Sequence, residues 1–218
     1  RCAIDGGYHM EMKVCDTLCY QGSAKYNEDI VGVSPFGAWV LDGATGLNNK
    51  NLVSDKSDAN WYVNWWNKYL HQNINKEIAL KEIMADGIKL IRDEYYGIVN
   101  KDRIEKLDTP SSSISIIKFY SDKIEYFLLG DCALHFKHED KVKIIKDRTL
   151  CYLDKLVYDE MENLPNLKEL SYEEIKSSVM KTIISNRLKK NTKDGYWILD
   201  FDKEAIDNSI NGFIYIKD

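Results

Sequence analysis

The fold of this chain is decided by residues 26–46, YNEDIVGVSPFGAWVLDGATG, in which acidic residues bound two short apolar segments. Glu28 and Asp29 precede the first segment, and Asp42 and Gly43 end the second. The short apolar runs, broken by glycine and proline, predict two strands over residues 29–42. Carboxylates at strand ends can form turns, but they are also the ligands that hard divalent cations prefer.

A third position repeats this pattern at Gly130 and Asp131, which the sequence places in a tight hairpin between two strands. Glycine beside an acid lets the backbone approach closely, and its carbonyl is a further oxygen ligand. Any one such acid is more commonly a turn residue than a metal ligand. Asp29, Asp42 and Asp131 together leave a turn role and a metal site as equal alternatives on spacing alone.

The rest of the sequence predicts an α+β fold with antiparallel sheets inside and helices outside. Residues 12–20 read as a strand, and an aromatic stripe from Trp61 to Tyr69, capped by Asp58, predicts a core helix. A second helix follows to Tyr95. Four β-rich segments between residues 111 and 147 then predict an antiparallel meander. The remaining expectations are a long helix opened by the Ser171–Glu174 capping box and ending near Leu188, a strand or extended segment at 195–199, and a helical turn or two at 203–208.

Composition excludes several functional classes. The net charge is −5, so no basic excess exists to neutralise nucleic-acid phosphates, and no apolar run approaches the roughly 20 residues that span a bilayer. Five scattered cysteines complete no zinc motif and predict reduced thiols in a cytoplasmic protein. Residues 1–9 lack the features of a signal peptide and read as an expression scar, with a single domain over residues 10–218.

Several motifs follow one another in a recognisable order. They are Asn27-Glu28-Asp29, Asp42-Gly43 within residues 40–46 (VLDGATG), the small residues at 110–115, Gly130-Asp131 within 128–134 (LLGDCAL), and Asn191 followed by 194–197 (DGYW). Together they resemble the metal-dependent PPM/PP2C protein phosphatases, especially their compact bacterial members. The resemblance covers the chain from about residue 13 to its end.

This resemblance implies a four-layer αββα sandwich of two antiparallel sheets flanked by helices. It also implies a serine/threonine phosphoprotein phosphatase with two Mn²⁺ or Mg²⁺ ions, in which a metal-activated water attacks phosphorus. On that basis Asp42 bridges the ions, Asp29 and the Gly43 carbonyl complete their ligands, and Glu28 orients bound water, which makes Asp42 and Glu28 the catalytic pair. Asp131 stands where the family can place a further metal.

The sequence departs from the family at two places. The phosphate-binding arginine is replaced by Ala24, which leaves the adjacent Lys25 as the candidate for the substrate phosphate. The S/T-D-G and D-N elements that supply further aspartates are absent, and Asp207-Asn208 precedes the place where they belong, so we expect a C-terminally incomplete domain. A catalytically inactive PP2C-like binding or regulatory module is therefore the alternative. The expected partner is a phosphoprotein, not nucleic acid or membrane, and no pattern indicates an oligomeric state.

Overall fold

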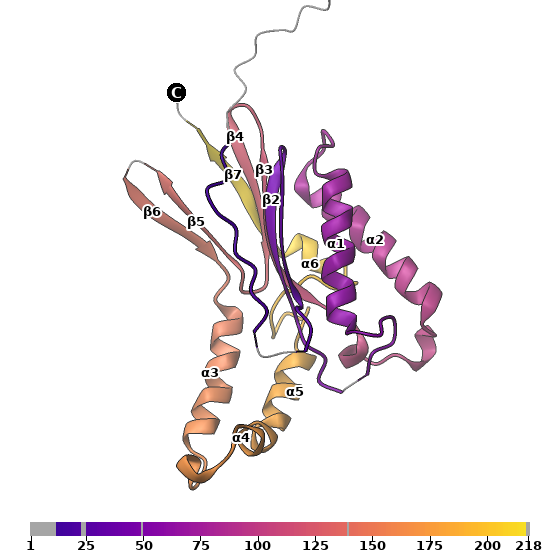
Figure 1. Ribbon diagram of the computed structural model, residues 1–218, viewed down its shortest axis with the longest axis vertical. Helices are drawn as coiled ribbons and strands as arrows, with labels where there is room; N and C mark the ends of the chain where they lie inside the picture. Colours follow the sequence, from indigo (N-terminus) through magenta and orange to yellow (C-terminus); the bar gives the residue numbers. More distant parts are fainter. Residues whose placement is uncertain (1–11, 23–24, 49, 139, 217–218) are drawn as a thin grey trace, which may run out of the picture.

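The computed structural model describes residues 12–22, 25–48, 50–138 and 140–216, so Ala24 and the predicted expression scar lie outside the described residues. The fold is α+β with two antiparallel sheets, as predicted (Figure 1). The larger sheet has five strands in the order β1-β2-β3-β4-β7, and the smaller consists of β5 and β6. The strands are β1 Asp29–Ser34, β2 Gly37–Gly43, β3 Ser112–Phe119, β4 Lys123–Leu129, β5 Ala133–His138, β6 Lys141–Lys146 and β7 Ile210–Tyr215.

Two helices cover one face of the larger sheet, and three others extend beyond one of its ends. Helices α1 (Asp58–Asn73) and α2 (Leu80–Ile98) cover one face, and the β5–β6 hairpin lies on the other side (Figure 1). Below the sheet, α3 (Thr149–Glu162), α4 (Tyr172–Ser178) and α5 (Met180–Leu188) form an arm. The remaining helices are α6 (Glu204–Asp207) and the 3₁₀ turns η1 (Lys101–Arg103), η2 (Lys106–Asp108) and η3 (Leu167–Glu169). Among the described residues, no helix has the length and apolarity needed to cross a membrane.

The core lies between the larger sheet and its two covering helices. Along β2 the side chains alternate: Trp39 and Leu41 are buried, whereas Val40 and Asp42 are exposed on the opposite face. This period-two pattern is what a strand with one covered face requires. The aromatic stripe of α1 completes the core as the sequence predicts, with its most buried members at Tyr62, Trp66 and Tyr69.

The meander that the sequence predicts is divided between two sheets. Strand β3 pairs with β4 and β5 pairs with β6, but β4 pairs with β7 instead of with β5. The predicted hairpin at Gly130-Asp131 is therefore wrong, because this turn carries the chain out of one sheet and into the other. The predicted strand at residues 12–20 is also absent. Residues 195–199 form no regular strand, but Tyr196 and Leu199 make isolated bridges with Lys190 and Ser112.

Two helix predictions change in detail, and one helix was missed. Ser57, not Asp58, caps α1, and its side chain accepts a hydrogen bond from the Asn60 amide at 3.0 Å. Asp58 instead accepts hydrogen bonds from the Leu52 and Val53 amides of the preceding loop. The helix predicted from the Ser171 capping box begins as expected but breaks at residue 179 into α4 and α5. Helix α3 was not predicted at all.

Close packing of α1 against α2 generates the first prediction. A Cβ added at Gly87 of α2 would lie 2.4 Å from the Trp66 ring, whereas one added at Gly97 of the same helix meets nothing within 4 Å. We expect Gly87→Ala to destabilise the protein by about 1–3 kcal/mol because the buried indole cannot move freely. Gly97→Ala is the matched control and should be neutral or stabilising by up to about 1 kcal/mol, from helix propensity alone. Urea denaturation of both variants measures the difference, and equal stability would contradict the packing explanation.

Candidate active site

The register of the larger sheet brings the predicted acids to one end of it. Asp29 at the start of β1 lies opposite Asp42 at the end of β2, and Asp42 in turn lies opposite Ser113 of β3. Directly opposed residues in an antiparallel pair have Cβ atoms about 4.5–5.5 Å apart, so the two carboxylates are immediate neighbours. Strand β4 ends one residue before Gly130, at the position opposite Ile114, which brings Asp131 to the same end.

The loop before β1 is fastened to its surroundings on both sides. The Asn27 side chain accepts a hydrogen bond from the Asp29 amide at 3.0 Å, and Asn60 of α1 donates to the Asn27 carbonyl at 2.6 Å. The Gly43 amide donates to the Glu28 carbonyl at 3.0 Å. A Cβ at Gly43 would lie 2.4 Å from that carbonyl oxygen, so only glycine permits this approach.

Asp131 is positioned by its glycine neighbour and by a serine. Gly130 has φ of 77°, a left-handed conformation that side chains rarely adopt, and a Cβ there would lie 2.2 Å from the Ser113 Oγ. The Gly130 amide donates to the Trp197 carbonyl at 2.9 Å. Ser113 donates from its hydroxyl to the Asp131 carboxylate at 2.6 Å, which fixes the acid beside β3.

The charges at this end of the sheet act on one another. Desolvation and the negative charges of Asp29 and Asp131, with a smaller effect of Glu28, raise the pKa of Asp42 from 3.8 to about 6. Asp42 is exposed at the strand end, so the desolvation is partial and solvent screens part of the repulsion. The direction of the shift nevertheless follows from the geometry, because several carboxylates share one small region. Such a group of like charges is what a bound cation would stabilise.

Cys132 follows Asp131 and lies close to these acids. Burial and the negative charges of Asp42, Asp131 and Asp29 raise the pKa of the Cys132 thiol to about 12. The thiolate is the nucleophilic form of cysteine, and at neutral pH this thiol is protonated. Cys132 is therefore unsuited to the covalent chemistry of a cysteine-dependent hydrolase.

A cavity of about 330 Å³ opens beside the acids, between the end of the sheet and the helical arm. The sheet contributes Asp42 and Ser113, and the turn after it contributes Asp131. The arm contributes polar and apolar side chains: Leu150, Leu153, Asp154, Val157, Tyr158 and Met161 from α3, and Ile183, Asn186 and Arg187 from α5. The cavity is completed by Ala44, Tyr196 and Ile198.

Two charged residues of this cavity were not predicted from the sequence. Asp154 of α3 lies close enough to Asp131 that desolvation and the charge of Asp131 raise its pKa. Arg187 of α5 reaches the loop after β2, where it donates a hydrogen bond to the Thr45 carbonyl at 3.1 Å. Neither residue belongs to a local motif, and only the packing of the arm against the end of the sheet brings them here.

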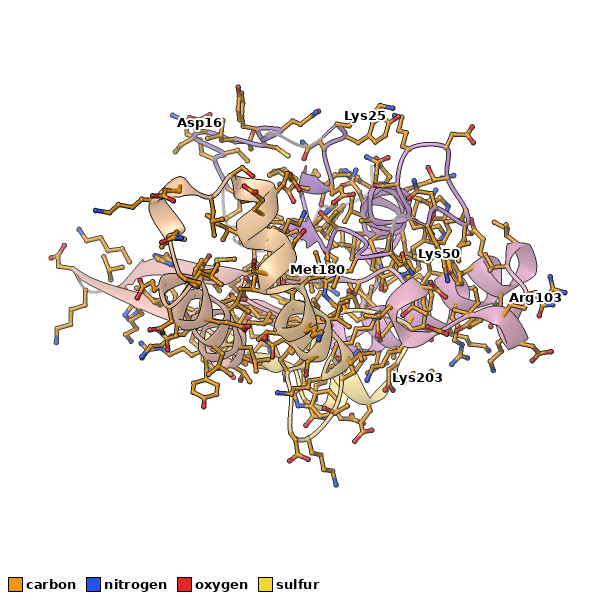
Figure 2. The ribbon with its side chains drawn as sticks, turned by 90° about the horizontal axis from the view of Figure 1, so that it is seen from below. Asp16, Lys25, Lys50, Arg103, Met180 and Lys203 are labelled. Atoms are coloured by element: carbon orange, nitrogen blue, oxygen red, sulfur yellow. The ribbon has the colours of Figure 1, made fainter. Side chains whose placement is uncertain are left out.

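The predicted residues are thus distributed unequally around the site. Asp29, Asp42 and Asp131 lie at one end of the sheet, and Glu28 is joined to the same region through a hydrogen bond from the Thr45 hydroxyl. Lys25 is exposed and does not line the cavity; its ammonium lies 5.1 Å from the centre of the Tyr26 ring. In Figure 2 it occupies the outer edge of the molecule. Across the described residues, no three Asp, Glu, His or Cys side chains converge tightly enough to form a metal site as they stand.

Several solved structures are similar to this chain, and the three compared here are serine/threonine phosphatases. The catalytic domain of PstP with two manganese ions is 15% identical over 67% of this chain and 59% of its own, with a TM-score of 0.45. The Mycobacterium tuberculosis phosphatase PstP/Ppp is 16% identical over 65% of this chain and 56% of its own, with a TM-score of 0.46. The S. agalactiae phosphatase is 11% identical over 90% of this chain and 71% of its own, with a TM-score of 0.47.

The chain therefore spans less than two thirds of either PstP structure. No model of a known protein family matches the sequence, and no curated protein matches it. The likenesses to solved structures are loose, so the function proposed below rests on the residues of this chain.

The crowding of carboxylates predicts a pH-dependent effect of Asp42→Asn on stability. The folded pKa of about 6 exceeds the ordinary 3.8, so the stabilising contribution of protonated Asp42 is complete below about pH 4 and is lost as the pH rises through 6. We expect Asp42→Asn to raise the Tm of metal-free protein at pH 7 by a few degrees, since each kcal/mol is worth about 2–4 °C in a chain of this size.

The difference in Tm between Asp42→Asn and the wild type should disappear near pH 4, where Asp42 itself is neutral. Thermal melts in EDTA across this pH range measure it. Asp122→Asn in the turn between β3 and β4, at the opposite end of the sheet, is the control and should show no such pH dependence. A Tm difference that is the same at pH 4 and pH 7 would contradict the electrostatic explanation.

Proposed function

We propose that this chain is a metal-dependent serine/threonine phosphoprotein phosphatase that hydrolyses phosphomonoesters. The observation that carries the proposal is the gathering of Asp29, Asp42 and Asp131 at one sheet end, beside a cavity open to the helical arm. Acids that only form turns have no reason to lie together, because each turn is stabilised by hydrogen bonds within a few residues. The loop glycines and the hydrogen bonds to Asn27 and Ser113 support the same interpretation, since they fix the acids in place.

The donor set suits hard divalent cations. Mn²⁺ and Mg²⁺ prefer carboxylate and carbonyl oxygens, and the site offers Asp29, Asp42, Asp131 and the Gly43 carbonyl. The raised pKa of Asp42 indicates unrelieved repulsion, which positive charge would remove. We propose that these groups hold two such ions, with Asp131 available to a third. The small rearrangement needed to bring the side chains together would accompany ion binding.

Bound cations of this kind lower the pKa of water and neutralise charge on phosphoryl oxygens. The residues of the chain then act by orientation. Glu28 is held by a hydrogen bond from the Thr45 hydroxyl to its Oε2, which leaves Oε1 as an acceptor that can orient the attacking water. Asp42 completes the catalytic pair from the centre of the acidic group. Burial raises the pKa of the Cys132 thiol, which favours direct attack of water over a covalent thiol intermediate.

Phosphopeptide hydrolysis tests the proposal. We expect turnover of phosphoserine and phosphothreonine peptides that requires Mn²⁺ or Mg²⁺ and falls by at least about 100-fold in Asp42→Ala, because several kcal/mol of charge stabilisation depend on the ions that it holds. Asp122→Ala, which removes a carboxylate from the far end of the sheet, is the matched control and should retain activity.

Calorimetric titration of Mn²⁺ into the same proteins separates the possible failures. A folded wild-type protein that binds neither Mn²⁺ nor phosphopeptide would refute the proposal. Phosphopeptide binding without turnover would instead identify a catalytically inactive binding module. Turnover that is unchanged in Asp42→Ala would show that another site performs the reaction.

A further inference from the structure

The cavity beside the acids contains one positively charged residue among the described residues that line it, Arg187. Its other charged lining residues are Asp42, Asp131 and Asp154, all negative. A phosphate group carries negative charge and would be repelled by these three carboxylates. Any ligand phosphate in this cavity therefore depends on the guanidinium of Arg187, on bound cations, or on both.

Arg187 is held in place without being neutralised. Its Nη1 donates to the Thr45 carbonyl, 3.1 Å away, and this is the only hydrogen bond that its side chain makes to the described residues. Arg187 takes part in none of the ion pairs found in the described ranges. A guanidinium has five N–H donors in a planar fork, so most of them remain available to a ligand.

Helix α5, which carries Arg187, is held against α3 by side-chain hydrogen bonds. Asn186, its neighbour in α5, donates from its side chain to the Leu153 carbonyl of α3 at 3.0 Å. Thr182, one turn earlier in α5, donates from its hydroxyl to the Glu160 carboxylate of α3. Because α5 is fastened to α3 at two points, the half-buried arginine is presented to the cavity from a supported element.

The surroundings of Tyr196 place the arginine close to the acids. Burial raises the pKa of the Tyr196 hydroxyl, the charge of Arg187 lowers it, and the charges of Asp200, Asp154 and Asp131 raise it. Positive and negative side chains thus both affect Tyr196, which also lines the cavity. Arg187 lines the same cavity as Asp42 and Asp131, so it lies within the same small region as these proposed metal ligands.

Lys25, the residue that the sequence predicts for the substrate phosphate, is placed differently. It is exposed on the ring of Tyr26 and is absent from the cavity lining. A lysine offers a point charge, whereas an arginine can form two parallel hydrogen bonds to phosphate oxygens. Position and chemistry both favour Arg187.

We propose that Arg187 is the residue that binds the phosphate of the substrate, from α5 instead of from the loop before β1. This inference rests on the proposed function for the identity of the ligand, a phosphorylated serine or threonine side chain. Two of the guanidinium N–H groups face the phosphate oxygens while Nη1 keeps its hydrogen bond to the Thr45 carbonyl. In this role Arg187 also couples the arm to the loop that holds Glu28.

Titration of inorganic phosphate into Mn²⁺-loaded protein tests the role by binding instead of by turnover. We expect Arg187→Ala to weaken phosphate binding by about 10-fold or more, because hydrogen bonds between charged groups are among the stronger ones. Arg187→Lys should recover part of the affinity, since it restores the charge but not the fork. Lys181→Ala removes an exposed positive charge from the same helix and should leave binding unchanged.

A purely structural role predicts a different pattern. If Arg187 only fixed the Thr45 loop, Arg187→Ala would weaken Mn²⁺ binding as much as phosphate binding. The phosphate affinities of Arg187→Ala and Arg187→Lys would then fall in the same order as their Tm values. Mn²⁺ affinity that is unchanged or tighter in Arg187→Ala, with phosphate affinity lost, supports the proposal. Phosphate affinity equal to wild type in Arg187→Ala overturns it, even if the phosphatase activity is established.

The test remains decisive if the proposed function fails. Should wild-type protein not bind Mn²⁺, a phosphoserine peptide and its unphosphorylated counterpart are titrated into metal-free protein. Binding that depends on the phosphate and is lost in Arg187→Ala supports the phosphate-binding role in a non-catalytic module. Binding that is absent, or that is the same in Arg187→Ala, overturns it.

Discussion

The antiparallel register of β1, β2 and β3 is the constraint on which the rest of this structure depends. It sets Asp29 opposite Asp42 and Asp42 opposite Ser113 at one end of the sheet. A slip of one residue would move every side chain of a strand to the opposite face. Trp39 and Leu41 would then leave the core and Asp42 would enter it, so the burial of these apolar side chains also holds the acids outside.

This arrangement explains how the protein tolerates a group of mutually repelling carboxylates. The apolar core beneath the sheet is extensive, with Tyr62, Trp66 and Phe127 fully buried. The core stabilises the strand register, so the fold does not depend on favourable interactions among the acids. Their repulsion is expressed in the raised pKa of Asp42. Strain of this kind is typical of sites whose geometry serves a ligand and is supported by the remainder of the fold.

The helical arm adds a second layer to the site, built from elements outside the sheet. The sheet end supplies the acids, whereas α3 and α5 supply an apolar wall together with Asp154 and Arg187. Their contacts with the sheet end are few: the hydrogen bond from Arg187 to Thr45 is one of them. In a protein built this way, the residues that select a ligand can change on the arm without disturbing the core that holds the acids.

Local patterns identify much of this fold. The short apolar runs within residues 29–42 predict the two strands that the structure shows as β1 and β2, and the Ser171–Glu174 capping box marks the start of α4. Each of these signals depends on neighbours within a few residues, which is why sequence alone can show them. The α+β class with two antiparallel sheets follows from the order of such segments and is confirmed.

The sequence by itself indicated strands β1 to β6, helices α1 and α2 and the acids at the strand ends, but neither α3 nor β7. Only the tertiary structure decided that β4 pairs with β7 and not with β5, and that Arg187 reaches a cavity lined by Asp42 and Asp131. The physical reason is that strand partners and cavity walls are chosen by burial and by contacts between distant segments. Those energies depend on the whole folded chain, and no local pattern records them.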